Sequence, residues 1–111
     1  NIKEIVKESD IDNGICHISS PHTTAAITIN EGADPDVRTD LTDSLNELVP
    51  DIEFKHDEGN SDAHLKCSLI GPTEETPLQD GEIQLGKWQK IYFCEFDGPR
   101  SRKYHVKIIE K

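Results

Sequence analysis

Apolar and polar residues alternate along the first third of the chain with two different periods. In residues 1–9 the apolar side chains recur at helical spacing, and the polar segment that ends at Gly14 stops the helix. Residues 15–19 and 25–31 are rich in β-branched side chains and alternate with a period of two, on either side of a break at Pro21. The pattern therefore predicts a helix followed by two strands.

The clearest helix is predicted over residues 34–49. Asp34 suits the N-cap and Pro35 the first helical position, and Pro50 ends the segment. Apolar residues recur three or four positions apart and form a single stripe, which consists of Val37, Leu41, Leu45 and Leu48. We expect this helix to be scaffolding.

Residues 56–71 open as a polar loop and then alternate with a period of two, which predicts a short strand. One face of this strand would carry His64, Lys66 and Ser68, and the other Leu65, Cys67 and Leu69. A polar loop braced by a strand is a common way to position chemistry. A solvated hairpin loop with chance histidines explains the pattern equally well.

The last third of the chain predicts further strands. A Pro-rich connection over residues 71–81 is either functional or held by a neighbouring subunit. Strands are expected near 91–96 and 102–109, with Asp97-Gly98 as the hairpin signal between them. About five strands and two helices indicate one α+β domain over residues 1–111, with a largely antiparallel sheet or sandwich.

Composition narrows the classes of function. The net charge is −10, which argues against binding nucleic acid or an anionic membrane through bulk charge. Only 33% of the 111 residues are hydrophobic, so the core is thin and we expect a homo-oligomer that shares burial between subunits. The chain starts at Asn1 and inside the predicted helix, so further residues are expected upstream.

Cysteine usage indicates the compartment. Cys16, Cys67 and Cys94 lie far apart in strand-like runs and form no CxxC pair. With an odd number of cysteines and neither a signal peptide nor a long apolar run, the pattern favours a reduced, cytoplasmic protein. The cysteines are interpreted as buried thiols.

Three histidines are candidates for a site, because each lies at the mouth of a predicted strand or on a loop that leads into one: His22, His56 and His64. Three imidazoles can hold a zinc-like ion and leave a fourth position for water or substrate. Their acidic neighbours could act as second ligand shell or general base, and these are Glu31, Glu58 and Asp62. The spacing matches no local metal motif. His17 and His105 are interpreted as cross-strand residues.

A second candidate feature is basic. Arg100 and Arg102 follow the Asp-Gly-Pro turn with their side chains on the same side, and Lys66 lies on the predicted strand. Guanidinium groups favour phosphate or carboxylate, which predicts a small anionic metabolite. Pairing with the many acidic side chains of the surface is the alternative. Trp88 is interpreted as a core or interface anchor.

Three separated motifs in one order resemble the YjbQ family, whose members are labelled thiamine-phosphate synthases. They are PHTTAAITINEGADPDVRTDL, HDEGNSDAHLKCSLIGPTEETPLQDGEIQLGKWQ and FCEFDGPRSRKYHVKI. The resemblance implies a compact β-rich α+β fold, trimers, and additional N-terminal strands that this chain lacks. The positions that match the family's polar site are His22, Thr23, Thr24, Glu31, Asp34, His56, Asn60, Asp62, His64, Gln89 and Arg100.

The resemblance implies an enzyme that joins a pyrimidine diphosphate to a thiazole phosphate and releases pyrophosphate. Arg100, Lys66 and a divalent cation would stabilise the leaving group, while His22 or His64 would orient the thiazole. A histidine-rich site favours a zinc-like ion over magnesium. Two other hypotheses use the same residues: a metal-dependent hydrolase with a histidine-bound water, and a metabolite-binding or assembly module without turnover.

Overall fold

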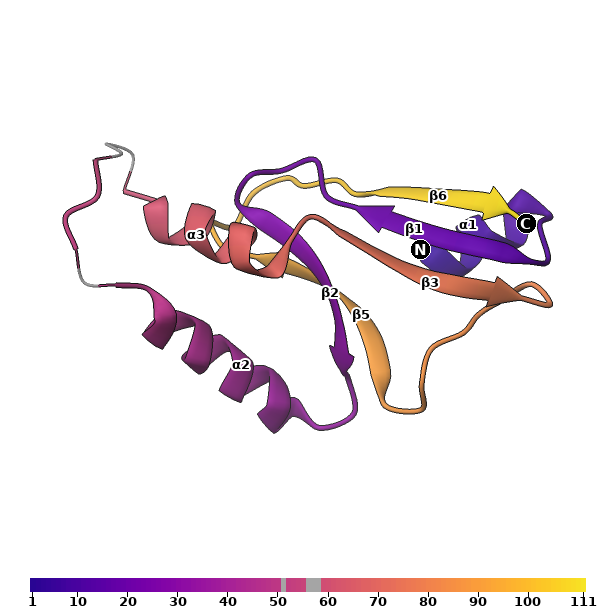
Figure 1. Cartoon of the computed structure of the whole chain (residues 1–111), viewed down its shortest axis with the longest axis horizontal. Helices are drawn as coiled ribbons and strands as arrows, with labels where there is room; N and C mark the ends of the chain where they lie inside the picture. Colours follow the sequence, from indigo (N-terminus) through magenta and orange to yellow (C-terminus); the bar gives the residue numbers. More distant parts are fainter. Residues whose placement is uncertain (51, 56–58) are drawn as a thin grey trace.

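The chain folds into two antiparallel sheets and three helices, seen in a computed structural model that describes residues 1–50, 52–55 and 59–111 (Figure 1). The elements follow in the order α1 (Ile2–Ser9), β1 (Gly14–Ser19), β2 (Ala25–Glu31), α2 (Pro35–Leu48), α3 (Ser61–Ile70), β3 (Thr73–Gln79), β4 (Glu82–Ile83), β5 (Gln89–Glu95) and β6 (His105–Glu110). The predicted α+β class is confirmed. In the described part of the chain, no helix is both long enough and apolar enough to span a bilayer.

The larger sheet has the strand order β4-β3-β1-β6, and the smaller one pairs β2 with β5. Every strand pair is antiparallel, as the alternating patterns predicted. Cys16 and Ile18 of β1 face a core that also contains Val6 of α1, Ile27 of β2 and Leu78 of β3. The two sheets therefore share one hydrophobic core.

The opposite face of β1 points outward and carries His17 and Ser19 beside the exposed Ile15. His17 lies there between Glu75 of β3 and Lys107 of β6, and its Nδ1 is 2.9 Å from Oε1 of Glu75. His105 of β6 lies opposite Ser19 on the same face. Both histidines are thus cross-strand residues on the outer surface of the larger sheet.

Helix α2 confirms the predicted helix, including its start. The side chain of Asp34 accepts a hydrogen bond of 2.9 Å from the backbone N–H of Asp36, and Pro35 occupies the first position. The apolar stripe, however, is not buried: Leu41 is 42% and Leu48 64% exposed, and none of the helix's residues is fully buried. In Figure 1 the helix lies to one side of the two sheets.

The strand predicted within residues 56–71 is wrong, because residues 61–70 form helix α3. Ala63 and Cys67, one turn apart, are its buried residues and pack against β2, whereas Leu69 is exposed. In the predicted strand, Cys67 and Leu69 would have shared the buried face. Six alternating residues fit either period, and the alanine, two leucines and lysine of this run favour helix.

The loop predicted over residues 71–81 is also wrong, since most of it is strand β3 in the middle of the larger sheet. Thr76 and Leu78 alternate into the core. Asp80 and Gly81 both have positive φ angles, 52° and 79°, and join β3 to β4 as a two-residue hairpin turn. Proline in a central strand is rare, which is why this segment was interpreted as a loop.

The hairpin predicted at Asp97-Gly98 does not form. Strand β5 pairs with β2 in the smaller sheet and β6 with β1 in the larger one, so the segment between them crosses from sheet to sheet. Segment 96–104 therefore lies where the sheets meet, and it carries both arginines of the predicted site.

Candidate functional site

The candidate site lies where segment 97–104, the start of β2 and the start of α3 come together. His22 precedes β2, and its Nε2 is 3.0 Å from both the backbone N and the carbonyl O of Lys103. The ring accepts from the amide or donates to the carbonyl, according to its tautomer. It also meets Phe93 edge-on, with ring centroids 6.3 Å apart at 88°. Backbone and aromatic contacts thus fix the imidazole.

Arg102 is held by a two-pronged ion pair with Glu95. Its Nε donates to Oε1 at 2.7 Å and a terminal nitrogen donates to Oε2, while the same terminal nitrogen reaches the hydroxyl of Thr24 at 2.8 Å. Only 12% of the Arg102 side chain is exposed. Both oxygens of one carboxylate therefore occupy the guanidinium that the sequence offered for anion binding.

This ion pair shifts the ionisation of Glu95. The guanidinium of Arg102 donates to the carboxylate and lowers the pKa of Glu95 from 4.5 to about 2, helped by the backbone N–H of Asp97, which lies 3.1 Å from Oε2. In turn, hydrogen bonding to Glu95 raises the pKa of Arg102. Both groups are therefore charged over the whole neutral range.

Asp97 links the third helix to the other arginine. Its Oδ2 accepts from Nδ2 of Asn60 at 2.7 Å and from a terminal nitrogen of Arg100 at 2.8 Å, and its carbonyl accepts from Arg100 Nε at 2.9 Å. The Asp97 carboxylate fixes the orientation of the Asn60 amide, because a flipped amide would set two oxygens against each other. Arg100 is 55% exposed, so a ligand can reach it.

Asn60 carries an unmet hydrogen-bonding group. Its Oδ1 is buried and has no hydrogen-bond partner among the described residues. A buried acceptor without a hydrogen bond lowers the stability of the fold by about 1–3 kcal/mol. A ligand that donates a hydrogen bond to Oδ1 would remove this cost. Asn60 also precedes α3, whose first turn presents positive backbone dipole to the same region.

His64 shares a face of α3 with two residues that contact the site. It lies one turn after Asn60 and one turn before Cys67, at the i, i+4 and i+3 spacings that bring side chains to one face. The thiol of Cys67 lies 3.8 Å from the carbonyl of His22 and 3.3 Å from that of Ala25. The helix thus directs the His64 face toward His22.

The other predicted site residues lie elsewhere. In the β2–β5 pair, Ala25 opposes Glu95 while Glu31 opposes Gln89, so these two pairs are about 20 Å apart along the strands. Oε1 of Gln89 accepts from the N–H of Gly86 at 2.8 Å and shapes the loop before β5. The structure therefore separates Glu31 and Gln89 from the His22 cluster.

Lys66 also points away from the His22 cluster. Its Nζ donates to Oδ1 of Asn46 on α2 at 2.6 Å and lies 4.0 Å from Oδ2 of Asp62. The same lysine lines a cavity between α2 and the β2–β5 pair, together with Glu31. Lys66 thus ties α3 to α2, and Asp62 is its neighbour on α3. Thr23 is an exposed residue of the loop before β2.

The structure describes only some of the residues predicted to bind a metal ion. His56 and Glu58 lie outside the described residues. Within residues 1–50, 52–55 and 59–111, no three histidine, cysteine or acidic side chains are grouped so as to hold a metal ion. His22 and His64 alone supply two imidazoles, so a three-histidine site requires His56 and stays a prediction.

Two functional candidates were missed from the sequence, namely Glu95 and Asp97. Each anchors one arginine, and each immediately precedes or follows Phe96 in the third motif. The available signal was local: an acidic residue three positions before Arg100 in a turn, where both can meet. Nothing in the sequence distinguished Glu95 from the other acids of this acidic chain.

The fold and this cluster define a small antiparallel α+β protein with a polar site at the junction of its sheets. A family model described as UPF0047 protein YjbQ-like matches residues 1–111. A UPF0047 protein of Methanocaldococcus jannaschii is 52% identical over 94% of this chain and 76% of its own, and UPF0047 protein YugU of Bacillus subtilis is 44% identical over 97% and 83%. The chain belongs to the YjbQ family.

Solved structures agree with the family. The crystal structure of an uncharacterised YjbQ/UPF0047 protein from Clostridium acetobutylicum matches with a TM-score of 0.93 at 50% identity, covering 97% of this chain and 84% of that one. A protein of unknown function from Sulfolobus solfataricus matches with a TM-score of 0.92 at 36% identity, covering 99% and 82%. The predicted resemblance is thus confirmed.

Proposed function

We propose that this chain is a small-molecule enzyme that acts on a phosphorylated metabolite at the His22 cluster, which comprises His22, Asn60, His64, Asp97 and Arg100. The candidate reaction joins a pyrimidine diphosphate to a thiazole phosphate. The observation that carries the proposal is the network at the start of α3. There the exposed guanidinium of Arg100 and the amide N–H of Asn60 share the carboxylate of Asp97, and the amide oxygen of Asn60 has no partner among the described residues. Such a network offers both charge and hydrogen bonding to a ligand.

The reaction would place a developing negative charge beside Arg100. The carbon–oxygen bond of the pyrimidinylmethyl diphosphate breaks, its electron pair leaves with pyrophosphate, and the thiazole nitrogen supplies the pair of the new bond. Arg100 uses Nε and one terminal nitrogen for Asp97, and its other terminal nitrogen makes no hydrogen bond to the described residues. That nitrogen can donate to the leaving group.

His22 would orient the thiazole partner. Its ring is held by Lys103 and Phe93, so a substrate meets an imidazole of fixed direction. Asn60 would position a polar substrate group through Oδ1. A bound divalent cation would offset the negative charge that develops on the leaving pyrophosphate.

A second candidate function is a metal-dependent hydrolase. Metal-binding histidines commonly direct their other ring nitrogen to a backbone carbonyl or carboxylate, and His22 Nε2 lies 3.0 Å from the Lys103 carbonyl. No described residue hydrogen-bonds to Nδ1 of His22. This nitrogen, His64 and His56 would be the ligands, and zinc suits imidazole better than magnesium does.

Oligomerisation and a cytoplasmic location complete the proposal. The thin core and Trp88, which is 55% exposed and so suits an interface anchor, favour a homo-oligomer, and a trimer is the expected form. The free thiols of the described residues suit a reducing compartment. Light scattering during gel filtration would measure the mass, and a monomer at micromolar concentration would contradict this part of the proposal.

The proposal is tested by pyrophosphate release from the two phosphorylated substrates, with magnesium or zinc present. We expect release by the protein, a loss in kcat/KM of about 10²-fold in Arg100→Gln, and no change in Lys107→Gln on the outer sheet face. No release above background with either metal would contradict the enzyme. Binding of both substrates without release would favour the metabolite-binding module, and hydrolysis of a phosphate ester with zinc alone would favour the hydrolase.

A further inference from the structure

A cavity of about 370 Å³ lies between α2 and the β2–β5 pair. Tyr92 and Cys94 of β5 line it, and so does Phe93, whose ring also contacts that of His22. The volume falls in the range of small-molecule sites. The cavity therefore adjoins the His22 ring at Phe93 and extends from there toward α2.

The walls of the cavity are largely apolar. Leu41 and Leu45 of α2, Tyr92 of β5, Phe96 directly after β5 and Ile70 of α3 all line it. The hydroxyl of Tyr92 donates to the carbonyl of Glu31 at 2.8 Å, which leaves the ring as an apolar surface. Two aromatic rings and three aliphatic side chains suit a flat apolar body.

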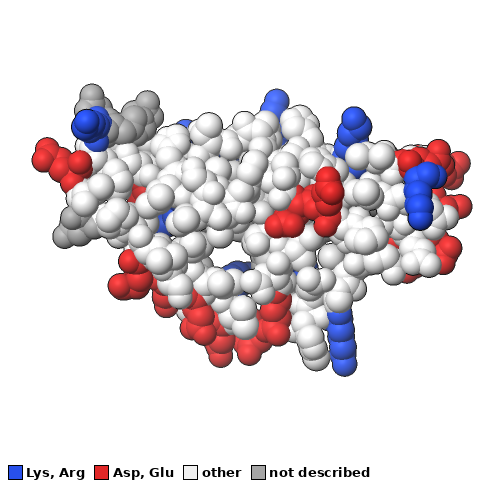
Figure 2. Space-filling view, in the orientation of Figure 1, with Lys and Arg blue, Asp and Glu red and all other residues white. Residues whose placement is uncertain are grey.

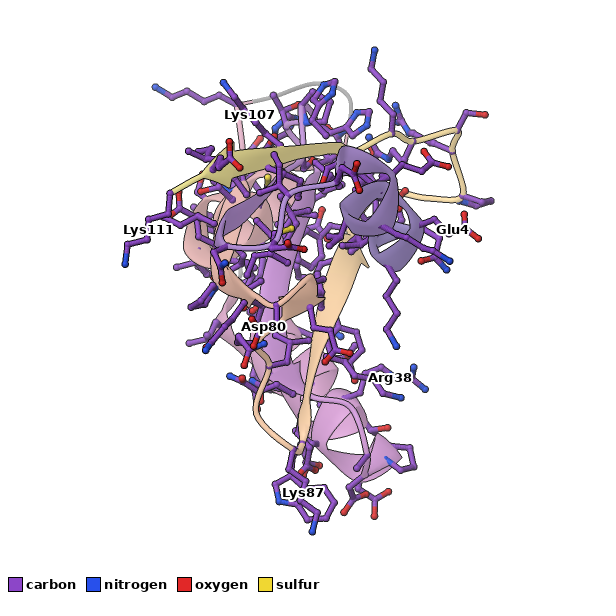
Figure 3. All side chains as sticks on the ribbon, turned by 90° about the vertical axis from the view of Figure 1, so that its right-hand side faces the viewer. Glu4, Arg38, Asp80, Lys87, Lys107 and Lys111 are labelled. Atoms are coloured by element: carbon purple, nitrogen blue, oxygen red, sulfur yellow. The ribbon has the colours of Figure 1, made fainter. Side chains whose placement is uncertain are left out.

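Two cationic side chains border the same cavity. Lys66 donates to the neutral amide of Asn46 and is 12% exposed. The carboxylate of Asp62, at 4.0 Å, offsets its positive charge only weakly. Arg38 makes no ion pair or hydrogen bond through its guanidinium to any described residue, although the chain carries a net charge of −10. Figure 3 shows Arg38 extending sideways from α2.

Helix α2 also carries acidic side chains, whose negative charge is opposite to that of Arg38 and Lys66. Its acidic residues are Asp36, Asp40, Asp43 and Glu47. Figure 2 shows acidic atoms gathered along this edge of the molecule and a hollow above them with basic atoms at its back. Two carboxylates, those of Glu31 and Glu95, line the cavity as well, but Glu95 is paired with Arg102. Arg38 and Lys66 therefore outnumber the one remaining carboxylate, which favours an anion over a cation.

We propose that this cavity binds a small amphiphilic anion, with an aromatic or aliphatic body between α2 and β5 and a phosphate or carboxylate at Arg38 and Lys66. The apolar walls would provide most of the affinity and the two cations the orientation and the selection of charge. The site differs from the one proposed for the enzymatic reaction, because its cations are Arg38 and Lys66 and not Arg100, although Phe93 borders both.

The test uses 1-naphthyl phosphate as the probe and calorimetry to measure its Kd. We expect saturable binding, at least tenfold weaker binding of 1-naphthol and of 1-naphthylmethylamine, and about tenfold weaker binding of the phosphate in Arg38→Gln. Arg100→Gln removes the same charge at the His22 cluster and should leave the Kd unchanged. 1-Naphthoate, which carries a carboxylate in place of the phosphate, distinguishes the two anionic groups within the same proposal.

Amide chemical shifts give a readout that requires no variant. Addition of 1-naphthyl phosphate should shift the amides of residues 92–96 and of α2, while those of β1 stay in place. The absence of binding at probe concentrations up to about 5 mM, where even weak specific ligands bind, would overturn the proposal. Loss of binding in Arg100→Gln with none in Arg38→Gln would also overturn it, and would assign the probe to the His22 cluster.

Discussion

Arg102 and Glu95 form a two-pronged ion pair that joins the end of β5 to the segment before β6. These two elements belong to different sheets, so the pair fastens the sheets together at the edge of the candidate site. The pair also separates the roles of the two arginines. Arg102 is committed to the fold, whereas Arg100 remains accessible for a ligand.

The first prediction concerns acid stability. Arg102 lowers the pKa of folded Glu95 from 4.5 to about 2, so the stabilisation is fully present above 4.5 and is lost as the pH falls through about 2. Glu95→Gln should therefore have a lower Tm than the native chain at pH 7, and the difference should shrink between pH 5 and 2. Thermal unfolding at a series of pH values measures this.

Glu82→Gln is a matched control, because Glu82 lies exposed on β4 and makes no ion pair with the described residues. Its Tm should follow that of the native chain at each pH. A difference between Glu95→Gln and the native chain that stays constant from pH 7 to pH 2 would mean that the carboxylate is not paired.

A second prediction separates the arginines by what each variant loses. Arg102→Gln leaves Glu95 without its partner and should lower the free energy of unfolding, whereas Arg100→Gln breaks an exposed pair and should change it by less than about 1 kcal/mol. The affinity for the pyrimidine diphosphate should fall only in Arg100→Gln. Chemical denaturation and calorimetry measure the two effects, and the reverse outcome would exchange the roles assigned here.

A third prediction tests helix α3. Ala63 is 1% exposed against β2, so Ala63→Gln should destabilise the fold by about 2–4 kcal/mol through overpacking and a buried amide. Leu69→Gln, on the exposed side of the same helix, should change stability by less than about 0.5 kcal/mol. Urea unfolding measures both. Equal losses would favour a strand, in which positions 63 and 69 share a face.

A fourth prediction concerns the local stability of α2. None of its residues is fully buried, so its amides should exchange with solvent through local opening, which costs far less than global unfolding. The amides of β1, paired on both sides, should exchange only on global unfolding. Native-state hydrogen exchange over a denaturant series measures both. Binding of 1-naphthyl phosphate should slow exchange in α2, and protection of free α2 equal to that of β1 would contradict the prediction.

Local patterns were enough for the elements that local chemistry determines. The alternation of Cys16 and Ile18 predicted β1, and Asp34 with Pro35 predicted the start of α2. Local patterns did not determine α3, because six alternating residues fit both periods, nor β3, because Pro77 masked a strand that is paired on both sides. Tertiary pairing decided both segments.

Pairing between distant segments also limited the prediction of the site. His22, Asn60 and Arg100 were selected by residue type, and the structure relates the last two through Asp97. Asp97 was interpreted only as a turn residue, because its partner Asn60 is 37 residues away in the sequence. Glu31 matched the family motif and Lys66 was selected for its charge, but both lie against the α2 cavity, a separation that residue type alone does not reveal.

The most direct test of the central claim follows the histidine rings by ¹H–¹⁵N NMR while the pyrimidine diphosphate and thiazole phosphate are added. His17 and His105 lie on the outer face of the larger sheet and serve as internal controls. Signals of His22 and His64 should shift together at one ligand affinity, and Arg100→Gln should weaken that affinity. Shifts confined to His17 or His105, or none at saturating ligand, would contradict a site at the His22 cluster.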